Sequence, residues 1–135
     1  MLRIVIPGIA RPKQRSRSTR TGHHYTPAAT VNQEAWIRQC AVEQIGQPCL
    51  AGAVIVRIAI RVAVPQSKSK KWKEDALTGR VWPTTKPDVD NTVKAIFDAF
   101  NGIVWKDDVQ IVEAHIYKCY AEKPSTVIEI EEIGA

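Results

Sequence analysis

Residues 86–108, which read KPDVDNTVKAIFDAFNGIVWKDD, include three carboxylates and a lysine that are candidates for catalysis. Asp88 and Asp90 open this stretch, Lys94 follows Asp90 by four residues, and Asp108 closes it. Carboxylate oxygens are the ligands that Mg²⁺ takes in proteins, usually one or two of them together with a substrate phosphate. A nearby lysine stabilises the negative charge that builds on a reacting phosphate. The sequence therefore offers Asp88, Asp90 and Asp108 as metal ligands and Lys94 as a catalytic cation.

The backbone around the first two carboxylates is expected to bring them together. Pro87 disfavours a helical start, so Asp88 and Asp90 are expected to lie in extended chain. Side chains two residues apart in extended chain leave the same face, and both carboxylates are expected to converge on one point. A helix is expected next, with Asp90 or Asn91 as its N-cap and Gly102 as its stop. Its apolar positions recur at helical spacing: Val93, Ile96, Phe97, Phe100, Ile103 and Val104.

Each of these residues also has an ordinary structural interpretation. Aspartate is common at helix N-termini, because it caps free N–H groups and suits the helix dipole. Lys94 lies four residues from both Asp90 and Asp98, which is the spacing of a surface ion-pair ladder. Asp107 and Asp108 together would also suit a simple turn. Taken jointly on a basic chain, the carboxylates favour a metal site, in which Asp107 either assists the metal or only shapes the turn.

The same stretch, extended to Lys118, resembles the core of the RusA-type Holliday junction resolvases. That family's pattern is D-x-D-N followed by a lysine, then F/L-D-A-L, then D-D before a strand ending in lysine. Its one softened position here is Phe100, where leucine is usual. The matching residues are Asp88, Asp90, Asn91, Lys94, Phe97, Asp98, Ala99, Phe100, Asp107, Asp108 and Lys118.

The resemblance implies a Mg²⁺-dependent endodeoxyribonuclease that resolves four-way junctions in branched DNA by symmetric nicking, in recombination and repair. It also implies a homodimer, since a junction has two symmetry-related strands to nick, and a cytoplasmic, nucleoid-associated protein of bacterial or phage origin. Two alternatives stay open: a non-catalytic basic DNA-binding module, or a nuclease for flaps, forks or RNA. The PD…(D/E)-x-K nuclease pattern is excluded, because Glu113 is followed by Ala114 and His115.

Composition agrees with a single globular domain over residues 1–135 that binds an anionic partner. The chain has a net charge of +5, a pI near 9.3 and 44% hydrophobic residues. Such charge points to partners such as nucleic acid and does not report on the fold. No apolar run approaches the ~20 residues of a membrane span. Cys40, Cys49 and Cys119 lack CxxC spacing, so buried free thiols are expected rather than disulfides or a zinc site.

Two segments are rich in basic residues and are expected to contact DNA. Residues 10–27 are expected to form an exposed loop whose cations bind phosphates; the alternative is a solubilising loop. Residues 67–75 surround Trp72 with lysines, and a short helix is expected there. Trp72 and Trp82 suit either a platform on which bases stack or a solvated face. The candidate DNA-binding residues are Arg11, Lys13, Arg15, Arg17, Arg20, Lys68, Lys70, Lys71 and Lys73.

The remaining elements indicate an α/β (α+β) two-layer domain, with a mainly antiparallel or mixed sheet of about four strands and two main helices on one face. Strands are expected at residues 2–6 and 52–64, the second with alternate apolar residues from Val54 to Val64 facing one way. After Asp108, two strands are expected to form an antiparallel hairpin, the first with Val112, Ala114 and Ile116 on one face. A helix is expected over residues 30–45, with Val31, Ala35, Trp36, Cys40 and Val42 on its apolar side.

Overall fold

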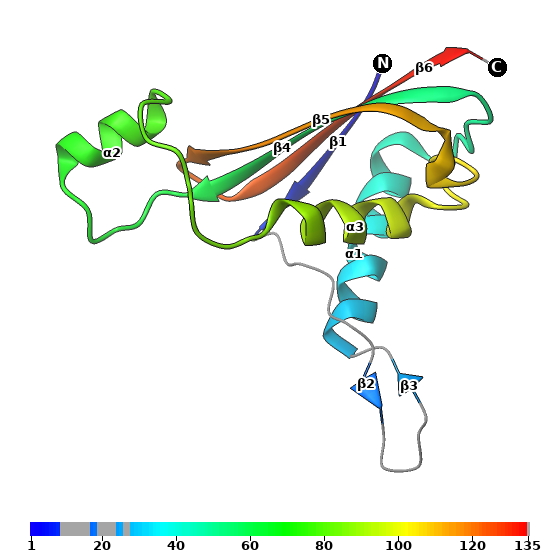
Figure 1. Ribbon diagram of the computed structural model, residues 1–135, viewed down its shortest axis with the longest axis horizontal. Coiled ribbons are helices and arrows are strands. Elements are labelled where there is room, and N and C mark those ends of the chain that lie inside the picture. The colour runs from blue at the N-terminus through cyan, green and yellow to red at the C-terminus, as the bar shows by residue number, and fades with distance from the viewer. Residues whose placement is uncertain (9–16, 19–23, 26–27, 135) are drawn as a thin grey trace.

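The computed structural model describes residues 1–8, 17–18, 24–25 and 28–134, with side chains described for residues 1–8 and 33–134 (Figure 1). Four long strands form one sheet, and two helices cover one face of it. A short third helix lies at one end of the sheet. In chain order the elements are β1 (Leu2–Pro7), β2 (Arg17–Ser18), β3 (His24–Tyr25), α1 (Ala28–Ile45), β4 (Ala53–Ala63), α2 (Lys70–Leu77), α3 (Val89–Phe100), the 3₁₀ turn η1 (Asp108–Gln110), β5 (Ile111–Ala121) and β6 (Ser125–Gly134).

The sheet is mixed, which confirms the predicted fold class. Its strand order is β1-β6-β4-β5; β4 runs parallel to β5, whereas β6 is antiparallel to both of its neighbours, β1 and β4. The predicted hairpin of the last two strands is wrong, because β4 lies between β5 and β6. β4 is the most continuously apolar strand. Its central place in the sheet lets the strands on both sides form hydrogen bonds with its backbone N–H and C=O groups. The parallel β4–β5 pair needs a long crossover connection, and that connection contains α2 and α3.

The core lies between the sheet and helices α1 and α3. Val54, Val56, Ile58 and Ile60 of β4 are all buried, as their alternation predicts. In α1 the predicted apolar side is correct at Cys40, which is buried, and wrong at Trp36 and Val42, which are 41% and 37% exposed, and at exposed Ala35. The side chain of Val31 lies outside those described. Cys40 shares the buried stripe of α1 with Ile37 and Ala41 at helical spacing.

Trp105 anchors the chain where it leaves α3. Its side chain is fully buried, and Phe97 and Phe100 meet the indole edge-on at ring-centre distances of 5.7 and 5.6 Å. The indole Nε1–H donates to Asn101 Oδ1 at 2.8 Å. Gly102 has a φ of +81°, the left-handed conformation that suits a helix stop, as predicted. The turn that follows α3 is therefore held firmly on the core.

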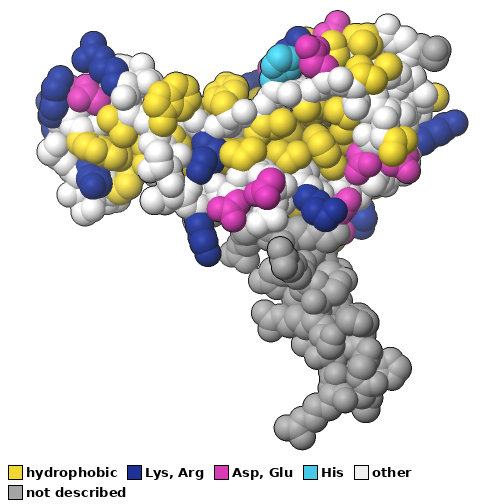
Figure 2. Space-filling model, viewed as in Figure 1, with side chains coloured by type: hydrophobic (Ala, Val, Ile, Leu, Met, Phe, Trp, Pro, Cys, Tyr) yellow, Lys and Arg dark blue, Asp and Glu magenta, His cyan; other side chains and the backbone are white. Residues whose placement is uncertain are grey.

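β5 is an edge strand whose helix-side face is only partly covered. Ala114 and Ile116 pair in register with buried Val56 and Ile58, so they share the core-facing side, as predicted. Ala114 is nevertheless exposed, and Val112, at a register irregularity, is 62% exposed. Figure 2 shows apolar side chains exposed across the middle of this view of the molecule.

The three cysteines are free thiols, as predicted, but only one of them is buried. Cys40 is buried in α1, Cys119 is half-buried in β5, and Cys49 is exposed in the turn before β4. Burial raises the pKa of the Cys40 thiol, and Glu43 adds to this shift. Burial also raises the pKa of Cys119, with Arg61 opposing it. No helix in the described part of the chain is long and apolar enough to cross a membrane.

Candidate active site

The first two carboxylates sit at the start of α3, but not in the arrangement predicted. Asp88 is the N-cap, with extended backbone (φ −71°, ψ 135°), whereas Asp90 already lies in the first helical turn. The predicted cap at Asp90 or Asn91 is therefore wrong, and the two carboxylates do not share one extended segment. The earlier start sets Val89 in line with Val93 on the side of α3 that packs against the core. The Asp88 side chain makes no capping hydrogen bond to the helix.

The turn after α3 holds the third carboxylate. Asp107 caps η1, with its Oδ1 accepting from the backbone N–H of Val109 at 3.2 Å. Gln110 completes this capping box: its Oε1 accepts from the N–H groups of Lys106 and Asp107, both at 2.9 Å. Asp107 thus shapes the turn. Asp108 follows as the first residue of η1 and is half-buried.

One open groove of about 490 Å³ gathers three of the four predicted catalytic residues. Asp90, Lys94 and Asp98 line it along one face of α3, and Asp108 lines it from the following turn. The predicted common helical face of Asp90, Lys94 and Asp98 is confirmed. The remaining lining residues are apolar: Val93, Phe97 and Ile111.

Asp88 is not among the residues that line this groove. It precedes α3, whereas Asp108 follows it, and a helix of 12 residues spans about 18 Å. Across the described residues, no three His, Cys, Asp or Glu side chains lie close enough together to hold a metal ion. The donor chemistry suits a hard cation, but one copy of the chain does not bring Asp88, Asp90 and Asp108 to one point.

The predicted DNA-binding residues divide between two segments. Arg11, Lys13, Arg15 and Arg20 lie outside the described residues. Arg17 belongs to β2, which pairs with β3, so part of the expected loop is a short two-stranded ladder.

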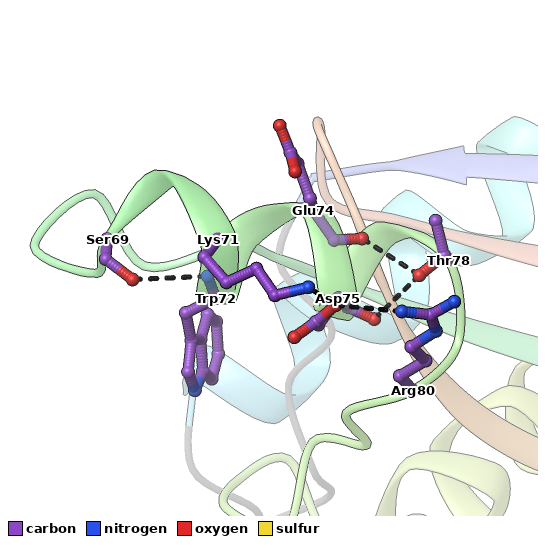
Figure 3. A network of polar contacts seen from close by, with 7 residues as sticks. All are labelled: Ser69, Lys71, Trp72, Glu74, Asp75, Thr78 and Arg80. Carbon is purple, nitrogen blue, oxygen red and sulfur yellow. Dashed lines mark hydrogen bonds and ion pairs between the residues drawn. The ribbon is translucent and has the colours of Figure 1, made fainter.

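The lysine-rich segment forms the predicted short helix, α2, whose network of polar contacts is drawn in Figure 3. Ser69 caps it by accepting from Trp72 N–H at 3.2 Å, and Asp75 pairs with Lys71 at 3.5 Å and with Arg80 at 3.6 Å. Basic side chains gather at this end of the molecule in Figure 2. Exposed lysines Lys68, Lys70 and Lys71 and half-buried Lys73 provide them.

The Trp72 side chain makes contacts within the protein. Its ring meets Tyr120 of β5 edge-on at 5.3 Å, and Lys68 Nζ lies 5.1 Å from the ring centre in a cation–π contact. The ring therefore docks α2 on the sheet. Trp82, at 57% exposure, keeps its surface available for stacking.

Two residues that support the site were not singled out as site residues from the sequence. Gln110 also donates from Nε2 to the carbonyls of Leu50 and Gly52, at 2.8 and 2.9 Å. Lys118 donates from Nζ to two carbonyls of the segment before Asp88. Lys118 appears in the family pattern, but nothing in the sequence identifies the distant partners of either residue.

An open mixed sheet with a carboxylate-lined groove beside a helix and a lysine-rich end suits an enzyme that cuts nucleic acid. The sequence profile of the family described as "Endodeoxyribonuclease RusA" matches residues 7–131, which is nearly the whole chain. The chain belongs to the RusA endodeoxyribonuclease family. Membership supports a nuclease of the Holliday junction resolvase type that acts on branched DNA in recombination. The chain is also 36% identical over 115 residues to "Uncharacterized protein YqaN" of Bacillus subtilis (strain 168), covering 84% of this chain and 81% of that protein.

Proposed function

We propose that this protein is a Mg²⁺-dependent endonuclease that resolves four-way DNA junctions by nicking two symmetry-related strands. The observation that carries the proposal is the groove that Asp90, Lys94 and Asp108 line together, in a chain of the RusA family. Its open shape suits a backbone phosphate, and the lysines of α2 suit the flanking phosphates.

The residues of the chain have distinct roles in this proposal. Asp88, Asp90 and Asp108 supply the carboxylate oxygens that hold the cation. When bound, Mg²⁺ supplies Lewis-acid polarisation of the scissile phosphodiester and a lower pKa for the attacking water. Lys94, one helical turn from Asp90 on the groove wall, orients the phosphate and balances the negative charge that grows on it. The apolar wall formed by Val93, Phe97 and Ile111 lowers the local dielectric on one side of the groove, which strengthens these electrostatic contacts.

The active unit in this proposal is a homodimer joined along β5. β5 pairs with β4 on one side and has no strand partner on the other among the described residues. An exposed edge strand is a template for pairing with another chain. Val109 and Val112, at and near the start of β5, are 80% and 62% exposed, which suits burial against a second copy.

The side chains along β5 favour pairing about Ala114 over pairing about Glu113. In a strand, the backbone N–H and C=O groups of alternate residues point to the same edge, and in an antiparallel pair these groups must face each other. Two copies of the same strand can therefore pair only in registers where one residue lies opposite itself. Pairing about Ala114 sets Glu113 opposite His115 of the other copy, and Val112 opposite Ile116. Pairing about Glu113 would instead set two glutamates face to face.

This register also bears on the separated carboxylates. In an antiparallel pair, the start of one β5 lies beside the end of the other. Asp108 precedes the start of β5, and Lys118, near its end, contacts the segment before Asp88. Two copies would therefore bring the groove with Asp90 and Asp108 of one copy toward Asp88 of the other, which supports a site shared between the copies.

The function is tested by incubating the purified protein with a synthetic four-way junction, a fork and a linear duplex, with and without Mg²⁺. Paired nicks in the junction that require Mg²⁺ are expected. Asp90→Asn and Asp108→Asn should abolish cleavage yet retain junction binding. Binding without cleavage by the wild type would favour the DNA-binding module, and preferential cutting of the fork would favour a different structure-specific nuclease.

The dimer is tested separately, without DNA, by sedimentation equilibrium. His115→Glu sets like charges opposite each other at two equivalent positions, each destabilising by about 0.2–1 kcal/mol, so the dimer should weaken by roughly 2- to 30-fold. Combining Glu113→Lys with His115→Glu restores opposite charges and should restore the dimer. A dimer that His115→Glu leaves unchanged would exclude this register.

A further inference from the structure

Lys118 makes an unusual pair of contacts across the molecule. It lies in the second half of β5, in register with buried Ile60, so its side chain starts from the core-facing side of the sheet. Its Nζ donates to the carbonyl of Thr85 at 2.6 Å and to that of Pro87 at 3.1 Å. These acceptors are 33 and 31 residues away in sequence.

Both carbonyls belong to the segment that delivers Asp88 to the start of α3. Thr78 to Pro87 contains no helix or strand, so hydrogen bonds of regular structure do not hold it. Pro83 and Pro87 are buried, and Lys118 adds contacts on both sides of Lys86. The residue after the second contact is Asp88.

The carboxylate of Asp88 is not committed to the helix. It makes no capping hydrogen bond, and its one described contact is a long one, 3.4 Å from Asn91 Nδ2. The place of this side chain therefore depends on the backbone that carries it. That backbone is fixed on its C-terminal side by α3, where Thr92 N–H donates to the Asp88 carbonyl at 3.1 Å. On its N-terminal side it is fixed by Lys118, which donates to the Pro87 carbonyl.

The side chain of Lys118 starts from the core-facing side of β5, where a charged group is unusual. An aliphatic residue would continue the apolar side of β5, and a charge drawn toward the core is unfavourable unless it is paired. The two carbonyls provide that pairing, and with two donors so occupied, Lys118 is poorly suited to bind a DNA phosphate itself.

We propose that Lys118 is a positioning residue for the metal site: it fixes the segment from Thr85 to Pro87 and so sets where the Asp88 and Asp90 carboxylates stand. This inference rests on the proposed function, because it assigns the positioned carboxylates to a metal. Residues that orient metal ligands typically change metal affinity or activity by about 10–100-fold when they are removed.

The test compares Lys118→Met, which keeps the length but removes the donors, with Lys118→Arg, which keeps charge and donors. Lys123→Met is the matched control, since Lys123 is an exposed lysine just after β5. Binding of Mg²⁺ is measured by calorimetry in the presence of uncleavable junction, and turnover is measured across a Mg²⁺ series. Lys118→Met should weaken Mg²⁺ binding and lower kcat by about 10–100-fold, with junction affinity and KM unchanged. Lys118→Arg should recover much of the loss, and Lys123→Met should match the wild type.

Two results would overturn the proposal. Wild-type Mg²⁺ binding and kcat in Lys118→Met would show that the contacts do not position the ligands. A loss of junction affinity with a shallower salt dependence would make Lys118 a phosphate contact instead. Lys118→Gln, shorter and uncharged, gives the same comparison if the methionine variant does not fold.

Hydrogen exchange keeps this test separate from that of the nuclease function. Lys118→Met should speed exchange in residues 84–92 of the metal-free protein, whereas Lys123→Met should not. A wild type that neither binds Mg²⁺ nor cleaves would refute the proposed function while this exchange difference still held. Unchanged exchange in Lys118→Met would refute the positioning role whatever the wild type does.

Discussion

Replacing Gln110 with alanine should loosen the turn that carries Asp108 and destabilise the whole protein. The Gln110 amide joins two distant regions of the chain, because its two donor contacts reach carbonyls 60 and 58 residues away in sequence. Its oxygen accepts from Lys106 and Asp107 N–H in the turn, and its nitrogen donates to Leu50 and Gly52 before β4. The four distances lie between 2.8 and 2.9 Å.

The size of the effect follows from the number and exposure of these bonds. A typical hydrogen bond contributes about 0.5–1.5 kcal/mol net, and the two to Leu50 and Gly52 are partly buried. Water can replace some of the exposed contacts to the turn, so the sum is discounted to about 2–4 kcal/mol. For a chain of this size, this corresponds to a fall in Tm of roughly 8–15 °C.

Urea unfolding and thermal melting measure this loss directly. Gln39→Ala is the matched control, because Gln39 makes one exposed contact, to Glu43 on α1, and its loss should cost under ~0.5 kcal/mol. Gln110→Glu keeps the acceptor and the shape but turns an oxygen toward the two carbonyls, so it should destabilise nearly as much as alanine. If Gln110→Ala unfolds within about 0.5 kcal/mol of Gln39→Ala, Gln110 does not hold the turn.

Four further outcomes are expected. Lys94→Ala should lower single-turnover cleavage by about 10²–10³-fold with at most ~1 kcal/mol lost in stability; a full rate would end its catalytic assignment. Thr92→Val should raise the unfolding free energy in urea by about 1 kcal/mol, since the 3%-exposed Thr92 has no hydrogen-bond partner for its Oγ1 among the described residues; a loss of stability would mean that the hydroxyl is paired. Trp105→Phe should cost about 2–3 kcal/mol by urea unfolding, and a change below 0.5 kcal/mol would contradict the anchoring role. Iodoacetamide at pH 8 should label exposed Cys49 first, because the raised pKa values of Cys40 and Cys119 leave less thiolate on them; peptide mass spectra showing equal rates would refute this, and labelling of Cys119 should rise with pH.

Local signals in the sequence were sufficient to predict individual helices and strands. The alternation from Val54 to Ile60 identified β4 and its buried face, because a period of two has only one structural meaning in a run of that length. Gly102, with its positive φ, ended α3 where expected. The common face of Asp90, Lys94 and Asp98 followed from helical geometry alone.

Competing local signals were where prediction failed. Asp88, Asp90 and Asn91 are all good N-caps, and the choice among them depends on which start lets Val89 join the core-facing side of the helix. In α1, Trp36 looks like a core residue from its size, yet the stripe through Ile37 and Cys40 is the one that faces the sheet. The sequence also pointed to a hairpin after β5, because a short connection carries no sign that β4 lies between the two strands.

The site itself depends on contacts that no local pattern encodes. Gln110, just before β5, fixes the turn that holds Asp108, and Lys118, near the end of the same strand, contacts the segment that leads to Asp88. The two ends of α3 are therefore held by Gln110 in η1 and by Lys118 in β5, and the polar face of the helix with Asp90 and Lys94 lies between them. A change on β5 that shifts its register against β4 should move all three carboxylates at once. The effect of a β5 substitution on cleavage must consequently be compared with its effects at both Gln110 and Lys118 before it is assigned to the dimer edge.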